Sequence, residues 1–111
     1  MILAVADIYA QIPRREEVRG LMRATQVRAR EQSGCEYYSF AETLDDPGHF
    51  VLLQQWRDQE ALDEHYASEA FADYQSRIGP LLVRVSELRV HEVSATARPV
   101  ESSPIDISQD D

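Results

Sequence analysis

Alternating apolar residues near the start of the chain predict a first β-strand over residues 2–11. Its side chains would form two sets on opposite faces of a sheet, Ile2, Ala4, Ala6 and Ile8 against Leu3, Val5 and Tyr9. Because both sets are mainly apolar, with Asp7 among the second, we expect both faces of this strand to be covered. An apolar stripe at intervals of three and four residues then predicts an amphipathic helix from Pro13 to about Gln32, closed by Ser33 and Gly34.

The middle of the chain predicts a hairpin followed by two short helices. Residues 35–44 and 50–57 are rich in aromatic and aliphatic side chains, and the short turn Asp45-Asp-Pro-Gly48 joins them. A connection of this length implies that the two strands are antiparallel. The helices would span residues 58–66, capped by Asp58, and residues 68–79, capped by Ser68, before a last strand over residues 82–93.

The order of these elements, β-α-β-β-α-α-β, predicts a ferredoxin-like α+β fold with a four-stranded antiparallel sheet and helices on one face. The other face of the first and third strands is also apolar, so it needs a second cover. We expect a second copy of the chain to supply it, which predicts a homodimer. The domain should span residues 1–94, and residues 95–111 should form an acidic, disordered tail.

The charge of the chain excludes several classes of partner. The 111 residues carry 11 Lys and Arg against 20 Asp and Glu, and the formal net charge of −9 repels nucleic acids and anionic membranes. No apolar run approaches the roughly 20 residues that a membrane span needs. Cys35 is the only cysteine, and the first residues lack the basic region of a signal peptide. We therefore expect a cytoplasmic protein that binds neither nucleic acid nor membrane.

The predicted helix over residues 58–66 carries the best candidate for chemistry, His65. Ala61, Leu62, His65 and Tyr66 share one face of this helix, so the imidazole should face the apolar layer. Burial would bring the pKa of His65 to near neutrality or below. The neutral ring would then accept the proton of a phenol or hydroquinone as a general base. The alternative is a structural histidine that is hydrogen-bonded to a backbone carbonyl.

Seven further residues are candidates for substrate binding: Trp56, Tyr66, Phe71, Tyr74, Tyr38, Asp7 and Arg84. The aromatic side chains would either wall a pocket for a flat substrate or pack as ordinary core. Asp7 would be a pocket carboxylate or a solvated edge residue, and Arg84 would meet an anionic substrate or pair with an acidic neighbour. His49 and His91 are interpreted as surface residues. The sequence contains no spacing typical of a metal site, a phosphate loop or a dinucleotide-binding motif.

Four segments together resemble the antibiotic biosynthesis monooxygenase family: Ser33-Gly-Cys-Glu-Tyr37, Asp46-Pro-Gly-His-Phe-Val-Leu-Leu-Gln-Gln-Trp56, Ala61-Leu-Asp-Glu-His65 and Ser68-Glu-Ala-Phe71. The resemblance covers roughly residues 1–94. It implies a dimeric α+β barrel with one pocket per subunit, and relatives that oxidise quinols or polycyclic phenols with O₂ but without metal or flavin. Where relatives often carry Glu two residues before the tryptophan, this chain has Gln54, so a negative charge is lost.

The function predicted from these observations is a cofactor-independent monooxygenase that oxidises a small aromatic quinol or phenol with O₂. His65 would be the base, and the seven further candidates would bind the substrate. Some relatives degrade haem, but Gln75 stands where that branch needs a ligating histidine. Two alternatives stay open: a non-oxygenase binder or isomerase of small molecules on the same dimeric scaffold, and a non-catalytic, stress-linked dimeric module.

Overall fold

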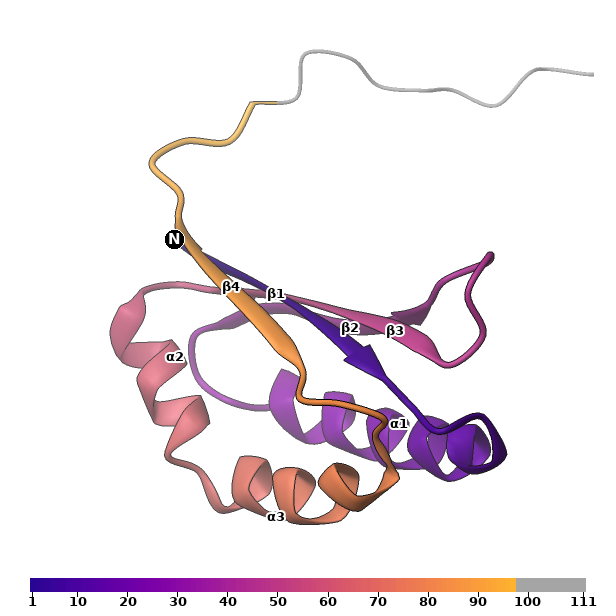
Figure 1. Ribbon diagram of the computed structural model, residues 1–111. Coiled ribbons are helices and arrows are strands. Elements are labelled where there is room, and N and C mark those ends of the chain that lie inside the picture. Colours follow the sequence, from indigo (N-terminus) through magenta and orange to yellow (C-terminus); the bar gives the residue numbers. More distant parts are fainter. Residues whose placement is uncertain (98–111) are drawn as a thin grey trace, which may run out of the picture.

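The computed structural model describes residues 1–97 and confirms the predicted ferredoxin-like α+β fold. A four-stranded antiparallel sheet forms one layer, and the helices pack on one of its faces (Figure 1). The elements follow the predicted order, with two short 3-10 turns added: β1 (Ile2–Tyr9), η1 (Ile12–Arg14), α1 (Arg15–Arg30), β2 (Cys35–Glu42), β3 (His49–Trp56), α2 (Gln59–Tyr66), α3 (Glu69–Ile78), η2 (Gly79–Leu81) and β4 (Glu87–Glu92).

The strand order β2-β3-β1-β4 places β1 and β3 at the centre of the sheet. These two strands are antiparallel, with Ile2 opposite Trp56 and Ile8 opposite Phe50. Because side chains alternate along a strand, the even-numbered residues of both strands face the helices, and these are the buried ones. The predicted hairpin between β2 and β3 is confirmed, and Gly48 adopts a positive φ of 83° in its turn.

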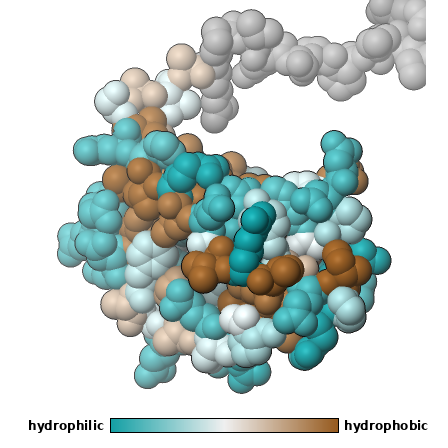
Figure 2. Space-filling model, in the orientation of Figure 1, coloured by the Kyte–Doolittle hydropathy of each residue, from teal (hydrophilic) through white to brown (hydrophobic). Residues whose placement is uncertain are grey.

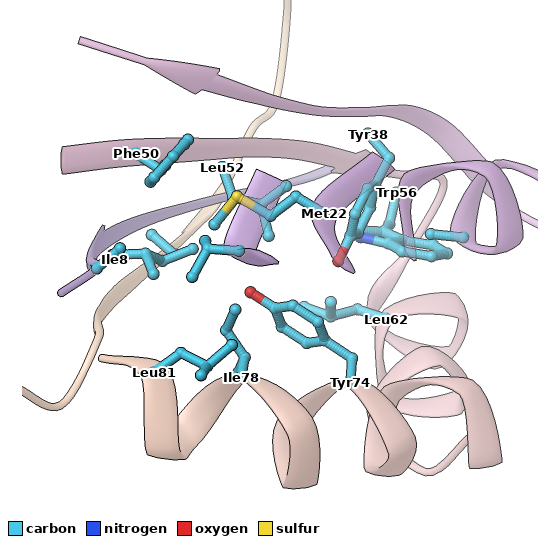
Figure 3. Close-up of a cluster of buried hydrophobic side chains, with 14 of the residues drawn as sticks. Ile8, Met22, Tyr38, Phe50, Leu52, Trp56, Leu62, Tyr74, Ile78 and Leu81 are labelled. Carbon is cyan, nitrogen blue, oxygen red and sulfur yellow. The ribbon is translucent and has the colours of Figure 1, made fainter. Parts of the chain in front are cut away.

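The hydrophobic core fills the layer between the sheet and the helices (Figure 3). Helix α1 buries Val18 and Met22 at the spacing that the sequence predicts. In Figure 3, Ile8 and Leu52 of the sheet face Ile78 of α3 across this layer. The core thus holds α1 and α3 against the two central strands.

The turn between α1 and β2 depends on Gly34. Its φ is +83°, and a Cβ atom at this position would lie 2.5 Å from the Cβ atom of Ala61 in α2. Its carbonyl oxygen also accepts a hydrogen bond of 2.8 Å from the backbone N–H of Arg57. Glycine at this point therefore lets α2 approach the turn closely.

The last strand is shorter than predicted. It begins at Glu87 rather than at residue 82, because residues 79–81 form a 3-10 turn and residues 82–86, here called the connector, leave the sheet after a single bridge to the end of β1. The expected first and second strands were also too long at their C-terminal ends. β4 lies at the edge of the sheet, and all of its residues are exposed.

The face of the sheet away from the helices, here called the open face, carries the second apolar set. Leu3, Val5 and Val51 are half-buried, and Leu53 and Tyr37 are 38% and 50% exposed. No helix of the described part of the chain covers this face (Figure 1). The prediction that both faces of the central strands are apolar is confirmed, and one of those faces is left uncovered in a single chain.

Most of the predicted acidic tail, residues 98–111, lies outside the described residues. Residues 95–97 follow β4 without regular secondary structure. Between residues 1 and 97, no helix combines the length and the apolar character needed to cross a membrane.

Candidate functional site

A cavity of about 670 Å³ lies between the sheet, α3 and the connector. Figure 2 shows apolar side chains gathered on this side of the molecule, near β4 and the connector. Small-molecule sites commonly have volumes of roughly 300–1,000 Å³, so the cavity can hold an aromatic ligand of several rings. Its lining is mainly apolar and comprises Ala6, Ile8, Leu52, Gln54, Tyr66, Phe71, Tyr74, Gln75, Ile78, Gly79, Leu82, Val83, Arg84, Val85, Ser86 and Leu88.

Three of the aromatic candidates form one wall of this cavity. Tyr66 lies at the end of α2, and Phe71 and Tyr74 lie on α3. The ring centroids of Tyr66 and Phe71 are 5.0 Å apart, and those of Phe71 and Tyr74 are 6.3 Å apart. Burial raises the pKa of both tyrosines. The structure therefore brings together the aromatic wall that the sequence suggested.

His65 is held on the buried face of α2. The helix begins after Asp58, whose carboxylate accepts a hydrogen bond of 2.9 Å from the backbone N–H of Ala61. The Nδ1 atom of His65 lies 2.7 Å from Oε1 of Gln32. A carbonyl oxygen can only accept, so Nδ1 carries the hydrogen and Nε2 is left as a bare acceptor. The histidine is indeed buried and bonded, but to a side-chain amide rather than to the backbone carbonyl considered above.

The Nε2 atom of His65 has no hydrogen-bond partner within residues 1–97 and is fully buried. The imidazole stacks on Trp56 at 4.8 Å between ring centroids, and the Tyr38 ring lies 5.3 Å away. Loss of solvent lowers the pKa of His65 to about 4, in the direction that its burial predicts. The ring is therefore neutral at pH 7.

His65 is not among the residues that line the cavity. The rings of Tyr66 and Phe71 both line it, and their centroids lie 5.5 and 5.2 Å from that of the imidazole. His65 thus lies one side chain behind the cavity wall. Direct contact between a ligand and Nε2 requires one of these two rings to move.

Trp56 is buried beside Gln54, a polar residue that was not among the predicted site residues. Its indole Nε1–H donates a hydrogen bond of 2.9 Å to Oε1 of Gln54, which is only 2% exposed and lines the cavity. A signal for Gln54 was present, because it is the polar member of the inward-facing series Phe50, Leu52, Gln54 and Trp56. Gln32, which lies just after α1, gave no comparable signal.

Tyr38 and Asp7 do not line the cavity. Tyr38 points inward from β2 and packs against His65, with its hydroxyl buried and without a partner in the described part of the chain. Asp7 lies on the open face, where it accepts hydrogen bonds from Nε2 of His49 at 2.8 Å and from Arg89 at 3.2 Å. The bond from His49 is the main cause of the lowered pKa of Asp7. The expectation that Asp7 contacts the substrate is not supported by this placement. His49, interpreted as a surface residue, is half-buried and bonded to Asp7.

Arg84 lies in the connector, which borders the cavity, but its guanidinium group packs elsewhere. The guanidinium carbon lies 3.7 Å above the centre of the Tyr9 ring. That ring in turn stacks on His49 at 4.5 Å. Of the carboxylates within residues 1–97, none lies within ion-pair distance of Arg84. In the part of the chain that the structure describes, the expected acidic partner of Arg84 is therefore absent, and an aromatic ring takes its place.

Comparison of the sequence with known proteins finds one matching family model and similar proteins from two bacteria. Residues 1–77 match the family model described as antibiotic biosynthesis monooxygenase. Rv0793 of Mycobacterium tuberculosis, named as a candidate monooxygenase, is 36% identical over 87 residues, which cover 76% of this chain and 85% of that protein. Protein sll1783 of Synechocystis is 25% identical over 95 residues, and the match spans 86% of this chain but only 65% of the Synechocystis protein.

Solved structures show the same fold. The structure of Rv0793 matches with a TM-score of 0.81 at 29% identity, over 87% of this chain and 98% of the other. A Deinococcus radiodurans protein described as a candidate antibiotic biosynthesis monooxygenase matches with a TM-score of 0.86 at 20% identity, over 91% of this chain and all of that one. The second match supports the fold alone.

Proposed function

Because this chain belongs to the antibiotic biosynthesis monooxygenase family, we propose that it oxidises a small aromatic phenol or quinol with O₂ and without a cofactor. The observation that carries the proposal is the cavity of about 670 Å³, which is walled by aromatic rings and backed by a buried histidine nitrogen with no partner among the described residues. Flat apolar rings of the substrate would pack between Tyr66, Phe71 and Tyr74. The family supplies the reaction class, and the cavity supplies the kind of substrate.

In the proposed reaction the substrate itself supplies the electrons. Loss of the hydroxyl proton gives a phenolate, which transfers one electron to O₂. The resulting phenoxyl radical and superoxide combine to form a carbon–oxygen bond, and the O–O bond then breaks with loss of water. A phenol and O₂ thus give a quinone and water, and a hydroquinone and O₂ give a hydroxyquinone and water.

His65 is the proposed proton acceptor. Its Nδ1–H is held by Gln32, so the lone pair on Nε2 is free to accept. General-base assistance of this kind contributes roughly 10²–10⁴-fold to a rate. Because His65 lies behind Tyr66 and Phe71, the proposal requires one of these rings to turn aside when the substrate is bound.

Oxygen uptake by protein stripped of metal and flavin tests this function. With a panel of naphthols and naphthohydroquinones, we expect O₂ consumption to follow substrate oxidation, and His65→Phe to slow it by tenfold or more. His91→Gln is the matched control, because His91 is exposed on β4. Absence of uptake across the panel would reject the oxygenase. Binding without turnover would instead support a protein that binds small molecules without oxidising them. The position of His65 favours this alternative, because Tyr66 and Phe71 separate it from the cavity.

The open face is the proposed interface with a second copy. Its half-buried and exposed apolar side chains, which include Leu53 and Tyr37, have no cover within the described chain. A sheet-to-sheet contact would bury them and leave the cavity on the other side of the sheet free. Each subunit of the proposed homodimer would then carry one complete cavity.

A further inference from the structure

Gln54 places an amide group in the floor of the cavity. It lies on β3, the central strand, and its side chain points toward the helices between two apolar neighbours of the same face. It is 2% exposed to solvent, yet it belongs to the cavity lining. A buried amide needs hydrogen-bond partners, because an unpaired polar group in an apolar site is costly.

Trp56 determines which end of this amide faces the cavity. The indole N–H can only donate, so its partner at 2.9 Å must be the carbonyl oxygen of Gln54. Trp56 does not line the cavity, and the bond therefore turns Oε1 away from it. The amide nitrogen has two N–H donors. One of them interacts with the Tyr66 hydroxyl, and this interaction opposes the rise in the pKa of Tyr66. The other N–H is the donor left for a ligand.

We propose that Gln54 binds the oxygen of a phenolate ligand, its Nε2–H donating to that oxygen while Trp56 holds the amide in place. The inference deepens the proposed function, on whose substrate class it rests. It assigns the site a preference for the ionised over the neutral form of a phenol. It also names Trp56 as the positioning residue for that preference.

The rest of the cavity explains why such a donor is needed. The other lining groups are mainly apolar or phenolic, and the guanidinium of Arg84 lies over the Tyr9 ring. Gln75 on α3 and Ser86 in the connector are the further uncharged polar residues of the lining, whereas Gln54 is the polar one on the central strand. A phenolate in such surroundings would be destabilised by loss of solvent unless a donor compensated for it. Gln54 already has this effect on a phenol of the protein, because it opposes the rise that burial causes in the pKa of Tyr66.

A chromophoric phenol can test the assignment without any turnover. The probe is 4-nitrophenol, whose neutral and ionised forms have different absorption spectra, titrated with pH in the presence and absence of saturating protein. We expect binding to the wild-type protein to lower the probe's pKa, with the phenolate bound about tenfold more tightly than the phenol. In Gln54→Glu the carboxylate still accepts from Trp56 but cannot donate, so the preference should reverse.

Two further variants separate the donor from other effects. Gln54→Met removes both polar ends at similar size, and we expect the bound probe to favour its neutral form. Gln59→Glu adds the same charge in the exposed first turn of α2, away from both the cavity and the open face, and should behave as the wild type. The proposal is overturned if the wild type prefers the neutral phenol, if Gln54→Met retains the preference for phenolate, or if the probe does not bind. A preference for phenolate without O₂ uptake would sustain this inference and reject the oxygenase.

Discussion

Burial of a neutral imidazole should make the stability of this protein depend on pH in a way that can be traced to His65. The pKa of this residue falls from its ordinary value of 6.5 to about 4 in the folded state. Between these two values the unfolded chain binds a proton that the folded chain does not. The folded state therefore loses stability as the pH falls from about 6.5 toward 4.

The size of this loss follows from the pKa values. Each pH unit corresponds to about 1.4 kcal/mol, so the fall from 6.5 to about 4 corresponds to about 3 kcal/mol between pH 7 and pH 4. Carboxylates with lowered pKa values, such as Asp7 and Glu42, lose stabilising interactions in part of the same range. These carboxylates contribute equally to the wild type and to a variant that lacks only the imidazole. The difference in stability between the two proteins therefore reports His65 alone.

Urea unfolding of the wild type and His65→Phe at pH 7, 5.5 and 4 provides this comparison. Phe keeps an aromatic ring in the stack on Trp56 but cannot take up a proton. The variant leaves Gln32 without its donor, and this costs about 1–3 kcal/mol with little dependence on pH. We expect the wild type to lose about 3 kcal/mol more than the variant between pH 7 and pH 4. Equal losses would refute the argument that His65 is buried and neutral.

Other substitutions test the fold and the assembly. Gly20→Ala should stabilise the protein by about 0.5–1 kcal/mol, because Gly20 lies inside α1 with open space around it. Gly34→Ala should destabilise it by at least ~1 kcal/mol, because Gly34 has a positive φ and an added Cβ would clash with Ala61. Urea denaturation measures both changes. Asp58→Ala should lower the melting temperature in a thermal scan, because the cap of α2 is lost. Leu53→Glu should convert the proposed dimer to a monomer in light scattering, since it places a charge on the open face.

Clear outcomes would contradict each of these expectations. If Gly34→Ala stabilises the protein or leaves its stability unchanged, the conformational argument for residue 34 fails, and if Gly20→Ala destabilises it, the argument for residue 20 fails. An unchanged melting temperature in Asp58→Ala would mean that water replaces the cap at no cost. A wild-type protein with the mass of one chain at micromolar concentration would remove the dimer, whatever Leu53→Glu does.

The layers of this fold could be predicted from the sequence because they depend on local periodicity. Alternation in the first strand assigned Ile8 to the core and Asp7 to the other face of the strand, and three-to-four spacing identified the buried side of α1. The same local patterns identified the caps of α2 and α3. The last predicted strand was harder to place, because residues 82–86 carry enough apolar side chains to resemble a strand although they leave the sheet and line the cavity.

The site could be predicted only in part, because its polar contacts join residues far apart in sequence. The buried face of α2 indicated His65, but its partner Gln32 comes from a different element, and no local pattern relates the two. In the same way, nothing local indicated that Arg84 would pack on Tyr9 rather than on a carboxylate. Periodicity shows which way a side chain points, whereas its partner depends on how the elements meet.

The outer side of β4 offers a row of backbone N–H and C=O groups that no neighbouring strand of residues 1–97 takes up. Such a row is a template on which foreign strands can assemble, and aggregation usually begins there. The strand counters this hazard with the charged residues Glu87, Arg89 and Glu92. In a second copy laid alongside in register, each of these residues would face its own counterpart, and the two like charges would repel each other. Engineering that neutralises these residues is therefore expected to reduce solubility before it affects the cavity.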